Sequence, residues 1–378
     1  MLFQLWEYPR GDQTVFRKDG HVVVASHQLA KEVLTDSSRF SAGNALDAVT
    51  DLSGSTMREL AKHRFRLPPT MANNATESHP RLRSTVAEAF HPAKVASLRP
   101  WLTGLVRRQM ISVSSQLRTG RTVDLDAQIS AEIPLVALGH LLGLPSGSTR
   151  VVKRFSRAAL EMFWGRPNAQ RQLELARIIG PYHALLRSHV READAGTMAK
   201  VRDDFSEDQA TAALFFLLVA GQETTAQFIT LLLHRLMSQP EVLQAVQAGQ
   251  AAEVVEEGLR LFPSIVSWRR VAKADCELDG MPIAAGESIL VWLAAAGRDP
   301  AITECPERLV PGQRGSRKHV AFGAGAHRCL GSQLTRLEAE IVLSEVTPLL
   351  RRCQVVTSPV SPENVSFRMP GPFTVSEK

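Results

Sequence analysis

From residue 80 onward, apolar side chains recur mostly every three or four positions, the spacing of an α-helix that buries one face. Proline and glycine residues interrupt this pattern and divide it into separate helices. A mostly α-helical protein is therefore predicted. The predicted helices cover residues 81–91, 94–117, 127–142, 149–164, 170–193, 206–238, 241–248, 251–261 and about 330–352.

Two regions instead show short apolar runs on either side of a tight-turn dipeptide. Asp19-Gly20 predicts a β-hairpin over 14–25, and Asp279-Gly280 predicts another within the strand-rich region 269–294. A helix over His27 to Leu34 and short strands near the C-terminus complete the prediction. The stretch 41–76 is expected to be irregular, and a loop of that length is typical of a lid or binding segment. Since no linker-like stretch divides the chain, we expect one large domain over 1–378.

Composition narrows the function classes. The chain has 378 residues, of which 44% are hydrophobic and 22% charged, as in a folded soluble protein. No apolar run is long enough to span a bilayer, and Met1 to Glu7 lack the features of a signal peptide, so a cytoplasmic protein without a membrane anchor is expected. The net charge is +6, but the basic residues are scattered and no nucleic-acid motif is present. A dispersed basic surface fits an acidic protein partner instead.

The segment from His319 to Gly331 carries the clearest chemical signal. It predicts a short strand, a glycine-rich turn and Cys329 at the start of a helix, where free N–H groups stabilise a thiolate. Such a thiolate can bind a soft or borderline metal ion. A dinucleotide-binding loop is excluded, because Arg328 stands where the third glycine would be needed. A buried cysteine in an ordinary turn is the other alternative.

Two further elements contain polar residues within apolar helices. Residues 220–225 place Glu223 and Thr224 in the middle of the longest predicted helix, and the Thr224 hydroxyl can bond to the Ala220 carbonyl and open a local groove. An acid beside an alcohol in such a groove can deliver protons to a ligand, although a solvent-facing polar turn is the alternative. Glu257 and Arg260 share one helix face and can form an ion pair.

These three elements, in this order and across nearly the whole chain, resemble the cytochrome P450 family of haem-thiolate monooxygenases. Residues 322–331 match the family pattern FGxGxHxCxG at every fixed position, 220–225 resemble its oxygen-activation motif, and Glu257 with Arg260 match its ExxR pair. Residues 306–309 resemble its PERF segment with leucine in place of phenylalanine. The sequence departs from the usual family pattern at 73–78, which lacks the common acidic and proline residues, and at Gly297, where asparagine is frequent.

The resemblance implies a fold and a set of site residues. The fold would be the α-rich P450 domain, with haem b between the long central helix and the cysteine-loop helix. Cys329 would be the axial iron ligand and Glu223 and Thr224 the catalytic acid and alcohol. A structural ion cluster would contain Glu257, Arg260 and Arg308. The implied haem contacts are His79, Arg83, Arg270, Phe322, Gly323, His327 and Gly331.

The resemblance also implies a function. A soluble bacterial-type member would activate O2 with electrons from ferredoxin and ferredoxin reductase, and would hydroxylate or epoxidise a hydrophobic or amphipathic small molecule, with secondary-metabolite biosynthesis as the expected context. Oxidative coupling or desaturation, and a non-catalytic haem-binding protein, are the alternatives. The 41–76 loop is expected to contribute to specificity, and ordinary core packing is the alternative role for several pocket candidates. These candidates are Phe163, Trp164, Phe216, Val219, Ala220, Ile265 and Val266.

Overall fold

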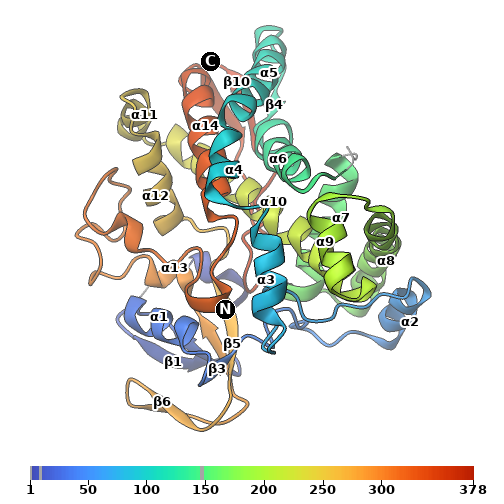
Figure 1. The fold of residues 1–378 in the computed structure, drawn as a ribbon. Coiled ribbons are helices and arrows are strands. Elements are labelled where there is room, and N and C mark those ends of the chain that lie inside the picture. Colours follow the sequence, from blue (N-terminus) through green and yellow to red (C-terminus); the bar gives the residue numbers. More distant parts are fainter. Residues whose placement is uncertain (1, 8–10, 145–148) are drawn as a thin grey trace.

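Helices make up most of the protein in the computed structural model, which describes residues 2–7, 11–144 and 149–378 (Figure 1). The mostly α-helical prediction is confirmed. The helices are α1 His27–Thr35, α2 Gly54–Lys62, α3 His79–Ala87, α4 Pro92–Ser97, α5 Arg99–Arg118, α6 Glu132–Leu142, α7 Thr149–Trp164, α8 Ala169–Glu192, α9 Gly196–Asp204, α10 Glu207–Met237, α11 Pro240–Gln247, α12 Ala251–Leu261, α13 Leu293–Ala296 and α14 Ser332–Leu350.

The strands form three sheets. A five-stranded sheet of order β1-β2-β8-β5-β3 lies at one end of the molecule, beside α1 (Figure 1), and in it β2 and β8 are parallel and the other neighbours antiparallel. A three-stranded sheet has the order β4-β10-β9, and β6 pairs with β7. Both predicted hairpin turns are present, because Asp19-Gly20 and Asp279-Gly280 have the positive φ angles of tight turns. The strands are β1 Val15–Lys18, β2 His21–Val24, β3 Phe40–Ser41, β4 Val123–Asp124, β5 Trp268–Ala272, β6 Cys276–Leu278, β7 Met281–Ile283, β8 Ser288–Val291, β9 Cys353–Thr357 and β10 Thr374–Glu377.

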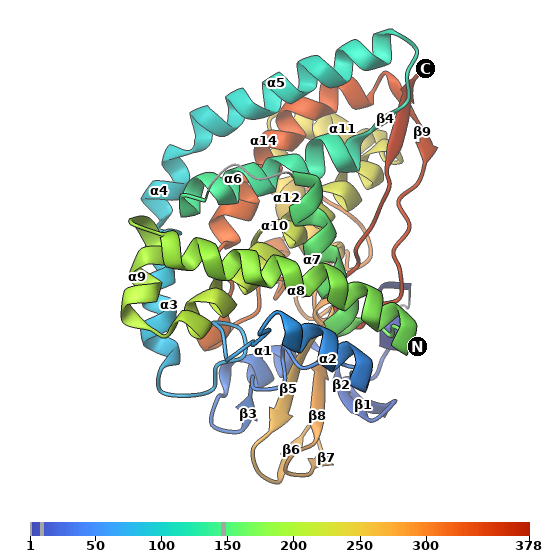
Figure 2. The ribbon, with the colours of Figure 1, turned by 90° about the vertical axis from the view of Figure 1, so that its right-hand side faces the viewer.

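The long helix α10 forms the centre of the core and contacts α6, α7, α8, α9 and α14 (Figures 1 and 2). Its N-terminus is closed by a capping box, in which Ser206 accepts from the Gln209 N–H and Gln209 accepts from the Ser206 N–H. Helix α10 is long and apolar enough to cross a membrane, but 78% of its most apolar 18-residue stretch is buried inside the protein. It is therefore a core helix.

The structure differs from the predicted elements mainly between residues 41 and 130. Helix α2 lies inside the stretch predicted to be irregular, where Ser53 caps it by accepting from the Thr56 N–H at 3.2 Å. The predicted helix 94–117 is two helices, because α4 ends at Ser97 and α5 begins at Arg99, with Pro100 in its first turn. Outside this region, helix α9 was not predicted either. Helices α2 and α9 are each nine residues long, and both pack against α8, with α9 also contacting α10. Helices this short depend on tertiary packing for their stability.

Candidate active site

A cavity lies between α10, β5 and the loop that leads into α14. Its walls are mostly apolar, and residues from distant parts of the chain meet there. The structure brings together many of the residues that the sequence singles out. Those lining the cavity are Arg83, Phe216, Ala220, Thr224, Ile265, Arg270, Phe322, Gly323, His327, Cys329 and Gly331.

The cysteine loop is a series of turns, and Cys329 lies three residues before α14 begins at Ser332. The Cys329 N–H donates to the Phe322 carbonyl at 2.9 Å, which closes the loop. Gly325 has a φ of +68°, and a Cβ added there would lie 2.7 Å from the Leu34 carbonyl oxygen. This position therefore needs glycine for two reasons, a left-handed backbone and a close approach to α1.

Cys329 faces the cavity. The surrounding protein desolvates its thiol and raises the pKa, while a hydrogen bond from the Gly331 N–H and the charges of Arg83 and Arg328 act in the opposite direction. A Cβ added to Gly331 would lie 3.8 Å from the Cys329 sulfur, in the space beside Phe90. Gly331 thus keeps that space free for a ligand that approaches the sulfur.

Two cations, Arg83 and Arg270, face the same cavity. Arg270 is 2% exposed, and its guanidinium donates to the Arg269 carbonyl at 2.8 Å. Burial lowers the pKa of Arg270 to about 10. Arg83 is half-buried and donates to the Arg328 carbonyl. No carboxylate of the described residues forms an ion pair with either arginine, although buried charges are ordinarily paired.

Two histidines lie beside these arginines. His79 and His327 are in contact with ring centroids 4.2 Å apart and planes tilted by 35°. Both donate to the Met71 carbonyl, at 3.1 Å from His79 Nε2 and 2.9 Å from His327 Nδ1. This shared acceptor leaves the other ring nitrogen of each histidine for a different partner. His79 does not itself line the cavity, whereas His327 does. Burial lowers the pKa of His327 to about 4, so this ring is neutral near pH 7.

These features fit the haem that the sequence resemblance implies. A porphyrin iron needs one protein ligand on one face, and Cys329 offers a soft sulfur. Two carboxylates of the porphyrin would pair with Arg83 and Arg270, which lack acidic partners among the described residues. The same described residues contain no group of three or more His, Cys, Asp and Glu side chains arranged for a metal ion. The donor set therefore suits a metal bound in a prosthetic group.

The hydrogen bond predicted on α10 is present, but the helix is continuous and does not break at Gly221. The Thr224 hydroxyl donates to the Ala220 carbonyl at 2.6 Å, and both residues line the cavity. Gly221 allows α6 to approach, since a Cβ there would lie 3.1 Å from the Leu138 side chain.

Glu223 lies on another side of α10 from Thr224. It is 1% exposed, does not line the cavity, and pairs with Lys153 at 2.9 Å and Arg157 at 3.4 Å. Burial opposes ionisation of Glu223, but the charges of Lys153 and Arg157 outweigh it and lower the pKa. The acid and the alcohol that adjoin in sequence therefore do not face the same space in this structure.

The Glu257–Arg260 pair is fully buried, with Arg260 donating to both Glu257 oxygens at 2.8 and 2.9 Å. Arg260 also donates to the carbonyls of Pro306 and Arg308. The structure corrects the expectation for Arg308, whose side chain is exposed and which contributes only its backbone carbonyl. The side chain that completes the cluster is Gln313, which donates to Glu257 at 2.6 Å and which the sequence analysis missed.

A second buried ion cluster, also missed from the sequence, connects α12 to the cysteine loop and α14. Glu256 accepts from Arg336 and pairs with His319 at 3.3 Å. The Arg336 guanidinium lies over the Phe322 ring, 4.7 Å from its centroid. Burial opposes ionisation of Glu256, but the hydrogen bonds from His319 and Arg336 outweigh it and lower the pKa to about 2. This cluster holds the start of the cysteine loop against α12.

The lowered pKa of Glu256 predicts a contribution to acid stability. A depressed carboxyl pKa stabilises the fold above the ordinary value of 4.5, and this stabilisation is lost as the pH falls toward 2. Between about pH 7 and pH 4, we expect the unfolding free energy of Glu256→Gln to fall by about 1 kcal/mol less than that of the wild type. Urea unfolding of both proteins at the two pH values measures this. An equal pH dependence in the variant and the wild type would contradict the assignment.

The pocket candidates divide into two groups. Phe216, Ala220 and Ile265 line the cavity, whereas the other candidates are buried outside its lining. Those outside are Phe163, Trp164, Val219 and Val266. The sequence analysis did not single out Trp268 and Phe367, which line the cavity and pack against Trp164, with ring centroids 6.1 and 4.9 Å from it. Their position follows from strand pairing and the path of the C-terminal segment, for which the local sequence offers no signal.

Comparisons with known proteins agree with this geometry. The family model described as Cytochrome P450 matches residues 250–377. The chain is 30% identical over 343 residues to vitamin D3 dihydroxylase of Streptomyces griseolus, covering 87% of this chain and 81% of that protein. It is 27% identical over 356 residues to cytochrome P450 119 of Sulfolobus acidocaldarius, covering 92% of each. The solved structure of cytochrome P450 CREJ in complex with (4-ethylphenyl) dihydrogen phosphate has a TM-score of 0.92, at 26% identity over 99% of this chain and 96% of that one.

Proposed function

This chain belongs to the cytochrome P450 family of monooxygenases, and we propose that within this family it hydroxylates or epoxidises a hydrophobic small molecule in secondary metabolism. One observation carries the proposal. Cys329, Thr224 and two arginines that have no acidic partner among the described residues all face one apolar cavity. Its lining offers a sulfur and two cations to a prosthetic group and an apolar surface to a second molecule.

The family implies a haem cofactor, and we propose that it is haem b. Cys329 would ligate the iron, Arg83 and Arg270 would pair with the propionates, and His79 and His327 would supply the remaining polar contacts. When bound, a thiolate-ligated haem supplies the electron density that favours cleavage of the O–O bond. Phe322, Gly323 and Gly331 line the cavity beside Cys329 and would contact the cofactor.

Thr224 is proposed to hold and pass a proton beside the cofactor. Its hydroxyl donates to the Ala220 carbonyl and can accept a hydrogen bond at the same time. Glu223 stays a predicted catalytic acid, but its position beside Lys153 means that its carboxylate would first have to leave an ion pair. The two residues therefore make separable contributions.

The substrate is proposed to be an apolar or amphipathic molecule without a strongly anionic group. Phe216, Trp268 and Phe367 provide the aromatic part of the lining. The basic side chains of the described lining are Arg83, Arg270, His327 and Arg328, and the proposed propionate contacts occupy three of them. CREJ binds an aryl phosphate. In this chain the one basic side chain left in the described lining is Arg328, which is exposed beside Cys329, the proposed iron ligand. The relative named for vitamin D3 supports an uncharged substrate.

Electrons are proposed to come from a ferredoxin and ferredoxin reductase, in the cytoplasm. Arg328 is exposed beside Cys329, and Arg314, Arg317 and Lys318 are exposed a short distance before it in the chain. Positive charge near Cys329, the proposed iron ligand, would attract an acidic redox partner.

The proposal is tested on the haem-loaded protein with a panel of neutral hydrophobic compounds and matched phosphate esters. We expect a type I spectral shift with neutral members, followed by NAD(P)H-dependent formation of a product that gains one oxygen atom when ferredoxin and its reductase are added. A product that has lost two hydrogens would instead support desaturation, and a joined product oxidative coupling. Oxygen consumption that no ligand and no ferredoxin pair raises would support a haem carrier.

Removal of the Thr224 hydroxyl should uncouple the reaction. In Thr224→Val, we expect NAD(P)H consumption to continue while the fraction converted to product falls by about tenfold, because a positioned proton donor is lost. Thr225→Val is the matched control, because Thr225 does not line the cavity and its hydroxyl forms a hydrogen bond with Thr335 of α14 at 2.9 Å. The ratio of product to NAD(P)H consumed measures the effect. Full coupling in Thr224→Val would overturn the assigned role.

A further inference from the structure

A second hollow, of about 550 Å³, lies between α7 and α8 and shares no lining residue with the candidate active site. We call it the α7–α8 groove. The two helices pack against each other, and the groove opens along their outer side. Its described lining contains three arginines, apolar and aromatic side chains, and no acidic residue.

The floor of the groove is apolar and rigidly packed. Phe155 is fully buried and stacks on Tyr182, with ring centroids 4.2 Å apart and ring planes 22° from parallel. Phe155 also packs edge-on against Phe215 of α10 at 5.1 Å. On the rim, Val151 is 51% and Leu185 45% exposed. An apolar ligand would cover surface that is in contact with water here.

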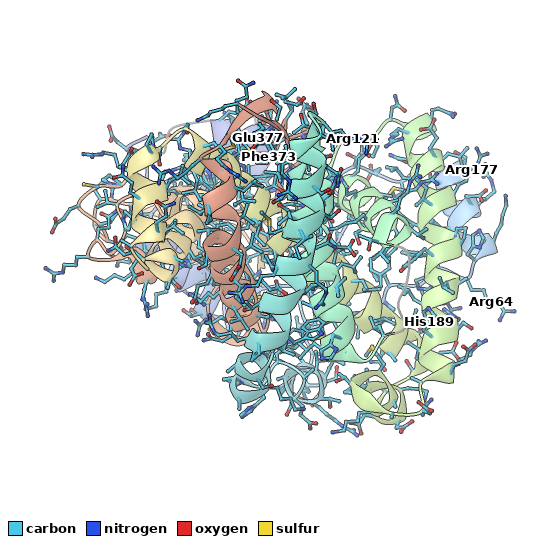
Figure 3. The ribbon with its side chains drawn as sticks, turned by 90° about the horizontal axis from the view of Figure 1, so that it is seen from above. Arg64, Arg121, Arg177, His189, Phe373 and Glu377 are labelled. Carbon is cyan, nitrogen blue, oxygen red and sulfur yellow. The ribbon has the colours of Figure 1, made fainter. Side chains whose placement is uncertain are left out.

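The rim is positively charged, and its described lining holds no acidic side chain. Glu59 and Glu174 lie near enough to Arg177 to attract it, but they form ion pairs with Lys62 and Arg171 instead. Arg150, Arg154 and Arg177 line the groove, and no carboxylate of the described chain forms an ion pair with any of them. Arg177 projects from the outer margin of the molecule (Figure 3). Every other arginine of α8 is ion-paired; these are Arg171, Arg187 and Arg191. The positive end of the α7 dipole adds to the same potential, because Arg150 and Val151 lie in its first turn.

We propose that the α7–α8 groove binds an amphipathic anion, a dissolved small molecule with an apolar chain or ring and a carboxylate, sulfate or phosphate head. The apolar floor would contact the chain or ring of such a ligand, and the three guanidinium groups would pair with its anionic head. A recess between two helices suits a single molecule, whereas a membrane surface would call for a protruding apolar face. The site is independent of the monooxygenase reaction.

Tyr182 offers a local probe, because the chain contains only two tyrosines. Protein loaded with haem and labelled with 3-fluorotyrosine would give two fluorine resonances, and Tyr182→Phe identifies the one in the groove. We expect octyl phosphate, below its micelle concentration, to shift that resonance saturably. Neither 1-octanol nor inorganic phosphate should do so over the same concentration range. An equal shift with 1-octanol, or a shift produced only by anionic lipid vesicles, would overturn the proposal.

The charge requirement is tested with two triple variants of equal net charge. Arg150→Gln/Arg154→Gln/Arg177→Gln should weaken octyl phosphate binding at least about tenfold. The matched control is Arg108→Gln/Arg118→Gln/Arg121→Gln, which removes three exposed arginines near α5 that form no ion pair among the described residues. The control should bind as tightly as the wild type. Equal weakening in both triples would show a general charge effect and overturn the site, and an unchanged urea midpoint verifies that each variant is folded.

Discussion

Serine in place of Cys329 is expected to abolish monooxygenase activity and to remove the far-red Soret band of the carbon monoxide complex after reduction with dithionite. Sulfur is a soft ligand that ionises within reach of neutral pH, whereas the serine hydroxyl is a hard donor that stays protonated. Because the added electron density at the iron comes from the thiolate, its loss should remove the chemistry while leaving the cavity intact. The difference spectrum of wild type and variant at equal haem content measures the change.

The same substitution elsewhere in the chain provides the control. Cys276 lies on β6, outside the cavity lining, so Cys276→Ser should keep the far-red band and the activity. A far-red band that persists in Cys329→Ser would show that another residue ligates the iron. Absence of haem binding by the wild-type protein would contradict the site as a whole.

Glu257→Gln is expected to lower the free energy of unfolding by about 3–5 kcal/mol, because it leaves the Arg260 charge buried without its partner. Both side chains are completely inaccessible to water. The variant also weakens the hydrogen bonds of Glu257 with Gln313 and the Val310 N–H, which hold the irregular segment before the cysteine loop. Urea unfolding of the haem-loaded proteins measures the difference.

A surface ion pair gives the matched comparison for this prediction. Glu345 pairs with Arg107 at 2.9 Å, but the Arg107 side chain is 66% exposed. Glu345→Gln should therefore change the unfolding free energy by about 0–1 kcal/mol. If Glu257→Gln cost no more than this control, the buried pair would not be what holds the segment to α12.

Local sequence patterns were sufficient where neighbouring residues determine the structure. The Asp19-Gly20 and Asp279-Gly280 turns, the Glu257–Arg260 pair and the bond from Thr224 to Ala220 all join residues at most four positions apart. Each follows from turn geometry or from the 3.6-residue period of the helix.

The sequence by itself thus determined the helical class, the hairpins, the cysteine loop and the family that they indicate. Tertiary structure alone decided which side chains meet across distant segments: Gln313 instead of the Arg308 side chain beside Glu257, Lys153 beside Glu223, and Trp268 with Phe367 in the cavity wall. The physical reason is that side-chain direction within an element follows local periodicity. The partner that satisfies a buried charge or fills a cavity depends instead on how the elements pack, and packing is set by the whole chain.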